Sequence, residues 1–306
     1  MPPTPAIEAH GLSKSYESII ALRDLNLTIN EGEIYGLVGR NGAGKTTFMR
    51  LLLGLLRPSS GTVRVLNRTA GDPAALIEVG SLVESPAMYP HLTGRDNLLL
   101  LAHYCRSSTD DVASALARVD LTDRADSKFR SYSLGMKQRL GVAAALLGDP
   151  RLLILDEPTN GLDPGAMVKM RDLLRELRER GRTILLSSHL LGEIEQVCDR
   201  IGVIHDGKLI IEGDLATVKS TAGQRLLLNA NPLTDALALL QRFTGLGECR
   251  IVGDEIEVAL ETATPAQINR MLVTADIEVN ELRLERRSLE DVFLGLTDDA
   301  TIKESA

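Results

Sequence analysis

The feature that most constrains the fold of this chain is a glycine-rich stretch between an apolar strand pattern and an apolar helix pattern. Residues 33–39, "EIYGLVG", have the length and composition of a short buried strand, and residues 46–56, "TTFMRLLLGLL", have those of a helix. Between them, residues 39–46, "GRNGAGKT", match the pattern G-x-x-x-x-G-K-[ST] in full. A strand, this loop and a helix in that order predict a phosphate-binding loop in an α/β fold.

The residue types of the loop suit a bound nucleotide. Glycines let backbone N–H groups approach an anion without a Cβ in the way, and the first turn of the helix directs further N–H groups at it. Lys45 is expected to reach the β- and γ-phosphates of ATP, and Thr46 to enter the shell of a Mg²⁺ ion. The predicted ATP-binding residues here are Gly39, Arg40, Asn41, Gly42, Ala43, Gly44, Lys45, Thr46 and Thr47.

Two acids follow a second apolar strand pattern, "RLLILDEP", at residues 151–158. Ligands of open α/β sheets bind at the carboxyl ends of the strands, where these acids would lie. We expect Asp156 to hold Mg²⁺ through water and Glu157 to orient the water that attacks the γ-phosphate. The alternative is an ordinary pair of strand-end acids, which the phosphate loop upstream disfavours.

Composition narrows the class of protein further. The 306 residues carry a formal net charge of -8, which argues against a protein whose main partner is nucleic acid. The three cysteines have no metal-ligand spacing and fit a reducing compartment. No signal peptide is visible, and no apolar run approaches the roughly 18 residues that a membrane span needs. If the chain acts at a membrane, another chain is expected to supply the membrane part.

The order of patterns divides the chain into a large and a small domain. Residues 1–5 are expected to be a tail, and residues 6–214 one α/β domain with antiparallel strands at its start and a helical part over about 85–150. Residues 215–306 have the pattern βαββαβ of a ferredoxin-like α+β domain. A last helix is expected over residues 288–296, "SLEDVFLGL", and nothing in the small domain indicates a chemistry.

One charged residue stands where a strand pattern meets a turn, in "GSLVESPAMYP" at residues 80–90. Pro86 and Pro90 end any regular element there, and Glu84 lies just before them. Taken alone, Glu84 would be an ordinary solvated loop charge.

In this order, the motifs resemble those of the ATP-binding subunit of ABC transporters, over roughly Ile7 to Glu212. "YSLGMKQRL" (132–140) resembles the signature segment of that family, although Leu, Gly and Gln of the usual motif are replaced. The resemblance implies that Ser133 and Gly135 contact the γ-phosphate bound to the other subunit. "NGLDP" (160–164) resembles the D-loop, with Asp163 facing the dimer partner.

The resemblance assigns three further residues. His189, in "LLSSHLLGE", matches the switch histidine that contacts the γ-phosphate, and Tyr16 matches the aromatic residue that stacks on adenine. Glu84 stands at the Q-loop, which usually carries Gln, contacts Mg²⁺ and the attacking water and lies against the membrane subunit. A glutamate followed by "SPAMYPHLTGRDNL" is similar to the bacitracin and lantibiotic self-protection branch of bacterial ABC exporters.

The resemblance therefore implies an ATPase of the P-loop NTPase fold with an ABC-type helical subdomain, which uses ATP and Mg²⁺. Its expected partners are a second ATPase subunit, identical or paralogous, and an integral membrane permease at the cytoplasmic face of the cell membrane; no nucleic acid is expected. The expected function is to power export of a drug or antimicrobial peptide. Alternatives are the ATPase of an importer or lipid exporter, a soluble non-transport ABC ATPase, and a catalytically silent regulatory module. The soluble class would need a long heptad insertion, which is absent from the sequence.

Overall fold

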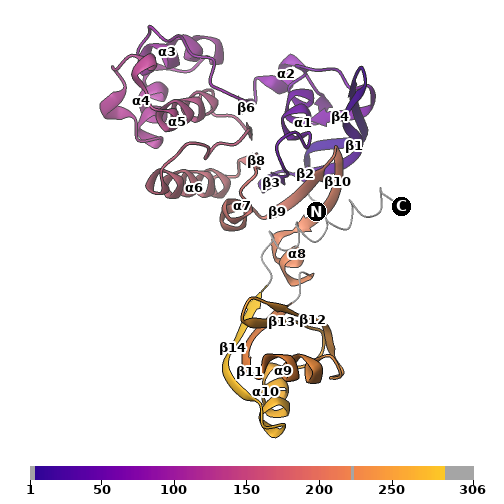
Figure 1. The fold of residues 1–306 in the computed structure, drawn as a ribbon. Helices are drawn as coiled ribbons and strands as arrows, with labels where there is room; N and C mark the ends of the chain where they lie inside the picture. The colour runs from indigo at the N-terminus through magenta and orange to yellow at the C-terminus, as the bar shows by residue number, and fades with distance from the viewer. Residues whose placement is uncertain (1–3, 222–223, 287–306) are drawn as a thin grey trace. The chain divides into compact units, whose positions relative to one another are not determined.

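A computed structural model describes residues 4–221 and 224–286 of the chain. Contacts between Cα atoms divide the chain into two compact units, Met1–Leu215 and Ala216–Ala306, which are described separately (Figure 1). The helix expected over residues 288–296 lies outside the described residues.

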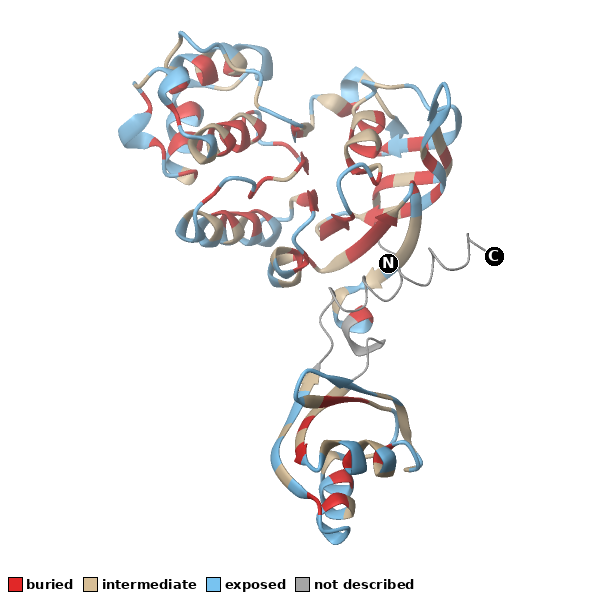
Figure 2. Ribbon diagram, in the orientation of Figure 1, coloured by how far each residue is buried: buried red, intermediate tan, exposed pale blue. Residues whose placement is uncertain are grey.

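The first unit is built on a six-stranded sheet with the order β10-β9-β3-β8-β7-β6. The four strands β3, β8, β7 and β6 are parallel, β9 is parallel to β3, and only β10 is antiparallel to its neighbour. Every residue of β3, β7 and β8 is buried, as expected for apolar strands covered on both faces (Figure 2). The strands are β3 (Ile34–Val38), β6 (Val79–Leu82), β7 (Leu152–Leu155), β8 (Thr183–Ser188), β9 (Arg200–His205) and β10 (Lys208–Asp214).

A second, antiparallel sheet with the order β2-β1-β4-β5 packs against the phosphate-loop helix. Its strands are β1 (Pro5–Tyr16), β2 (Ile19–Asn30), β4 (Ser60–Val65) and β5 (Arg68–Thr69). The predicted end of the tail at residue 5 is wrong, because Pro5 already pairs with Asn30 in the first strand. One apolar cluster joins this sheet to α1 (Lys45–Leu52) and to the central strands, with Phe48 and Leu52 fully buried.

Several helices of the first unit begin at polar residues whose side chains accept hydrogen bonds from backbone N–H groups. Thr93, Ser108, Ser133 and Asp163 cap α3, α4, α5 and α6 in this way. Among the described residues, no helix is long and apolar enough to cross a membrane. The remaining elements of the first unit are α2 (Pro73–Leu76), α3 (Gly94–Cys105), α4 (Thr109–Arg118), η1 (Thr122–Arg124), η2 (Phe129–Ser131), α5 (Leu134–Ala145), α6 (Pro164–Glu179) and α7 (Leu191–Val197), and α8 (Leu215–Thr221) begins at the last residue of this unit and otherwise belongs to the second.

The second unit has the ferredoxin-like order β12-β13-β11-β14, with all neighbours antiparallel, and this confirms the expected βαββαβ pattern. Its helices α9 and α10 pack on one face of the sheet through a separate apolar core that includes Leu228, Val258 and Ile268. The elements are β11 (Gln224–Asn231), α9 (Leu233–Leu240), β12 (Leu246–Val252), β13 (Glu255–Leu260), α10 (Pro265–Thr274) and β14 (Glu278–Arg286). α8 precedes β11 along the chain.

Candidate nucleotide-binding and hydrolysis site

The phosphate loop joins β3 to α1 and can adopt its path only with glycine at two positions. A Cβ on Gly39 would lie 2.4 Å from the carbonyl oxygen of Ile204, in the neighbouring strand. Gly44 has φ of +112°, and a Cβ there would lie 2.6 Å from the carbonyl oxygen of Ala21. The loop is therefore confined between the two sheets, and it leads directly into the first turn of α1, whose free N–H groups favour an anion.

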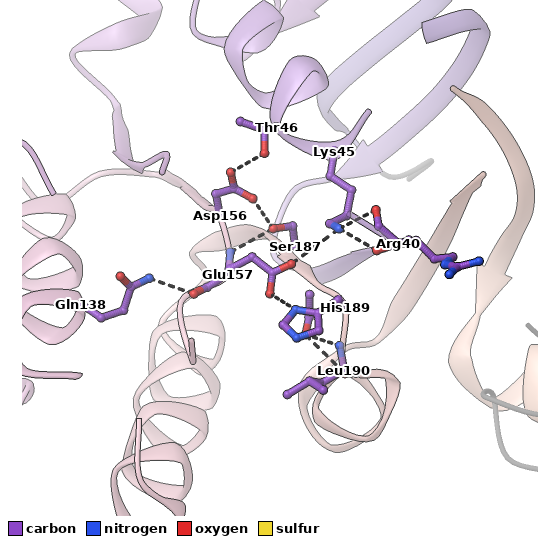
Figure 3. A network of polar contacts seen from close by, with 11 residues as sticks. Arg40, Lys45, Thr46, Gln138, Asp156, Glu157, Ser187, His189 and Leu190 are labelled. Carbon is purple, nitrogen blue, oxygen red and sulfur yellow. Dashed lines mark hydrogen bonds and ion pairs between the residues drawn. The ribbon is translucent and has the colours of Figure 1, made fainter. Parts of the chain in front are cut away.

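Lys45 is buried at the base of this loop. Its Nζ donates hydrogen bonds to the carbonyl oxygens of Gly39, at 2.6 Å, and of Arg40, at 3.3 Å. The same Nζ lies 3.5 Å from Oε1 of Glu157, which is an ion-pair distance without a hydrogen bond. The positive charge is thus held beside both the loop and the acid that follows β7 (Figure 3).

The register of the parallel strands brings the acids to the loop. β7 pairs with β8 so that Leu155 lies beside Leu186, which places Asp156 next to Ser187 at the carboxyl end of the sheet. Thr46 Oγ1 donates a 2.7 Å hydrogen bond to Oδ2 of Asp156. At nucleotide sites Mg²⁺ binds only a few protein oxygens. A hydroxyl and a carboxylate beside a phosphate loop are suited to be these ligands.

Glu157 and His189 form the other half of the site. Nδ1 of His189 lies 2.7 Å from Oε2 of Glu157, at the end of β8 (Figure 3). Oε1 of Glu157 is buried and has no hydrogen-bond partner, and the backbone of this residue has φ of +49°, in the left-handed region. A non-glycine residue in this region is uncommon, and an acid with an unsatisfied buried oxygen is suited to accept a hydrogen bond from a bound water.

The sequence analysis missed Ser187, which joins the two acids. Its hydroxyl donates to Oδ1 of Asp156 and accepts a 2.9 Å hydrogen bond from the backbone N–H of Glu157, and the residue has no exposed surface. Gln138 was also missed; its side-chain amide donates to the Glu157 carbonyl oxygen at 2.8 Å. The only sequence signal for Ser187 was a hydroxyl residue at the end of an otherwise apolar strand pattern.

We expect Ser187→Ala to lower the rate of ATP hydrolysis by about 10-fold or more while changing the KM for ATP little, because a partner that orients a metal-binding carboxylate typically contributes that much. Steady-state kinetics on the folded variant measure both constants. Ser188→Ala is the matched control, since that hydroxyl forms its hydrogen bonds with the backbone of Leu190. Equal losses in both variants would contradict a specific role for Ser187.

A cavity of about 200 Å³ is lined by both acids and by the predicted loop residues other than Gly39, namely Arg40, Asn41, Gly42, Ala43, Gly44, Lys45, Thr46, Thr47, Asp156 and Glu157. Of the residues predicted for this chain's own nucleotide, Gly39, His189, Tyr16 and Glu84 lie outside this lining. His189 reaches the site through Glu157, Tyr16 is 40% exposed with Lys14 over its ring, and Glu84 pairs with Arg50. Most residues that line the cavity were therefore among those predicted from the sequence, whereas the ion pair of Glu84 with Arg50 was not predicted.

The residues predicted to act on the other subunit's nucleotide do not line this cavity. Ser133 caps the helix α5, and a Cβ on Gly135 would lie 2.8 Å from the carbonyl oxygen of Gly161. Asp163 caps α6. Its carboxylate accepts a hydrogen bond from the backbone N–H of Ala166, and this hydrogen bond lowers the pKa of the carboxyl group. The signature and D-loop segments of one chain therefore pack on each other, and Leu134 between them is 64% exposed.

Fold and site together define a P-loop nucleoside triphosphatase. A family model described as "ABC transporter" matches residues 22–160. The chain is 39% identical to the bacitracin transport ATP-binding protein BcrA of Bacillus licheniformis, over 97% of this chain and 98% of that protein. It is 38% identical to the lantibiotic transport ATP-binding protein SrtF of Streptococcus pyogenes, over 67% of this chain and 90% of that protein.

Solved structures agree with this assignment. The ATP-binding cassette MJ0796, in a dimeric post-hydrolysis state bound to ADP and Pi, superposes with a TM-score of 0.64 and 26% identity, over 68% of this chain and 98% of that chain. The chain belongs to the family of ABC transporter ATP-binding subunits, and within it resembles the bacitracin and lantibiotic branch. It is accordingly a nucleotide-binding ATPase subunit.

Proposed function

We propose that the chain hydrolyses ATP to power export of an antimicrobial compound through a separate membrane subunit. The observation that carries the ATPase part is the convergence of Lys45, Thr46, Asp156, Glu157 and His189 at the carboxyl ends of three adjacent strands. Export of an antimicrobial is supported by relatives named for bacitracin and lantibiotic transport. The described residues also hold no long coiled-coil insertion, since their longest helix has 16 residues.

The roles of the side chains follow from their positions. Lys45 would exchange the loop carbonyls for the β- and γ-phosphates, which it stabilises as a mobile charge. Glu157, held by His189 and by the N–H contact to Ser187, would accept a hydrogen bond from the attacking water and orient it. Tyr16, exposed at the end of β1, would stack on adenine.

Mg²⁺ fits the oxygens of Thr46 and Asp156, and the carboxylate of Glu84 would accept a hydrogen bond from a metal-bound water. Bound there, the ion would supply positive charge that neutralises the phosphate oxygens. Among the described residues, no group of three or more His, Cys, Asp or Glu side chains is placed to hold a metal ion by itself. A site of two protein oxygens therefore depends on the nucleotide phosphates for its remaining ligands.

The exposed N-terminal end of the signature helix supports a composite site between two ATPase chains, either two copies or a copy and a paralogue. Ser133 and Gly135 would contact the γ-phosphate held by the partner, since a helix N-terminus with a hydroxyl cap favours an anion. Asp163 would face the same partner from the start of α6. The dimeric state of the cassette MJ0796 supports this arrangement. We place the assembly at the cytoplasmic face of the cell membrane, where the permease subunit anchors it.

Export can be tested in the cells that produce this chain. We expect deletion of its gene to lower the concentration of bacitracin or of a lantibiotic that arrests growth, and the wild-type gene to restore it. Complementation with Glu157→Gln should fail although the variant protein accumulates. Full resistance in the deletion strain, together with loss of uptake of a nutrient, would favour the importer alternative.

The small domain is expected to be dispensable for nucleotide binding, because its apolar core is separate from that of the first unit. A chain ending after Asp214 should bind ATP with a Kd within about twofold of the full chain, as expected for an independent domain. Fluorescence titration with an ATP analogue measures this Kd, and Lys45→Ala in the same truncated chain is the control for specific binding. Loss of binding in a folded truncated chain would place the domain boundary elsewhere.

A further inference from the structure

Glu84 lies at the start of the segment that leaves the central sheet after β6. The segment is anchored at its origin, because the backbone N–H of Asp156 donates a 2.7 Å hydrogen bond to the carbonyl oxygen of Leu82. Two residues later, Glu84 has φ of +63°, a left-handed conformation that a glutamate rarely adopts. Its side chain is 58% exposed and forms an ion pair with a guanidinium N–H of Arg50.

Arg50 connects this carboxylate to the phosphate loop. It lies on α1, four residues after Thr46, and positions four apart lie on the same side of a helix one turn apart. Thr46 in turn donates to Asp156, so a single side of α1 faces both the metal-binding oxygens and Glu84. The hydrogen bond to Glu84 raises the pKa of Arg50, and the negative charge of Asp156 acts in the same direction.

The glutamate itself makes this contact distinctive. A glutamine side chain carries no charge, so it can accept a hydrogen bond from Arg50 but cannot form an ion pair with it. A carboxylate is also a ligand that a divalent cation prefers. Arg50 and a cation beside Thr46 and Asp156 therefore attract the same negatively charged group.

We propose that Arg50 is a positioning residue that holds Glu84, and with it the segment of residues 83–90, away from the metal-binding oxygens until a divalent cation competes for the carboxylate. The proposal rests on the proposed ATPase function for the competing cation. The contact is suited to exchange, because both partners are partly exposed and exposed ion pairs are weak. Glu84 thus changes partner from an arginine to a cation-bound water as nucleotide and metal bind.

The first test uses the full chain without nucleotide or metal, so it does not depend on ATPase activity. Hydrogen exchange followed by mass spectrometry should give faster exchange over residues 83–90 in Arg50→Gln than in the wild type. Arg50→Lys should exchange at a rate between the two, because it keeps the charge and loses the planar fork. Equal rates in all three proteins would overturn the proposal.

The second test is a double-mutant cycle on the Mg²⁺ concentration that half-saturates binding of a fluorescent, non-hydrolysable ATP analogue. In the wild-type background, Arg50→Gln should lower this concentration by about threefold, the size expected for loss of an exposed ion pair. In a Glu84→Gln background, Arg50→Gln should leave it unchanged. Equal shifts in both backgrounds would show that Arg50 acts on the phosphates directly, which overturns the proposal.

The two tests separate this proposal from the proposed function. If no protein binds the ATP analogue while hydrogen exchange still responds to Arg50→Gln, the ATPase assignment fails and the ion pair stands as a structural contact. If binding is normal and the exchange rates do not differ, the ATPase assignment stands and the positioning role of Arg50 fails.

Discussion

Glu157→Gln is expected to bind ATP and Mg²⁺ as the wild type does and to hydrolyse ATP at least about 100-fold more slowly, the usual contribution of a positioned general base. The carboxylate that accepts from the attacking water becomes an amide, which is a far weaker base of nearly the same shape. Single-turnover hydrolysis and equilibrium binding on the same preparation separate the two effects. If a composite dimer forms, the variant should also accumulate as an ATP-bound dimer in size-exclusion chromatography.

The matched control is Glu179→Gln, which makes the same chemical change on an exposed residue at the end of α6. It should hydrolyse ATP at the wild-type rate. Hydrolysis by Glu157→Gln within a fewfold of this control would remove Glu157 from the mechanism, and His189, which contacts it, would then be the next residue to test.

Gly80→Ala is expected to destabilise the first unit by about 3 kcal/mol, the upper end of the usual cost of overpacking a core. A Cβ on this residue of β6 would lie 1.9 Å from the carbonyl oxygen of Ala145 and 2.9 Å from Cδ2 of Leu153. The carbonyl of Ala145 at the end of α5 cannot yield without moving backbone. For a unit of this size the melting temperature should fall by about 6–12 °C.

Differential scanning calorimetry measures this shift, and the second unit provides an internal reference if it melts separately. Gly192→Ala, in α7, is the control because nothing lies within 4 Å of its Cβ position. It should change stability by less than about 1 kcal/mol, the range of helix propensity between Gly and Ala. A Gly80→Ala protein as stable as this control would mean that β6 and α5 do not approach as closely as the structure shows.

The elements that were predicted correctly from the sequence are those whose conformation is determined by residues close together along the chain. The buried strands β3 and β7 were predicted because every residue in them is apolar, and the hairpin at Asp206 and Gly207 because that dipeptide suits a two-residue turn, where both residues have positive φ. The error at Pro5 has a non-local cause, since a proline can begin a strand when the partner strand supplies the pairing.

The residues of the site likewise fall into those that local sequence predicts and those that only tertiary contacts bring together. Lys45 and Thr46 could be predicted to share a cavity because they lie in a contiguous loop, and Asp156 and Glu157 because strand ends in an α/β sheet meet ligands. Ser187 lies about thirty residues along the chain from the acids that it holds, and only the pairing of β7 with β8 brings them together. A single serine in an apolar pattern carries no signal of that pairing.

By itself, therefore, the sequence determined that this chain binds nucleotide phosphates. The loop with its helix start is one run of adjacent residues, and the acidic strand end is another. The tertiary structure alone decided which groups hold those acids in place and which partner Glu84 takes. It did so because strand register and the contact of α1 with the segment that follows β6 join residues that are 30 to 34 positions apart along the chain.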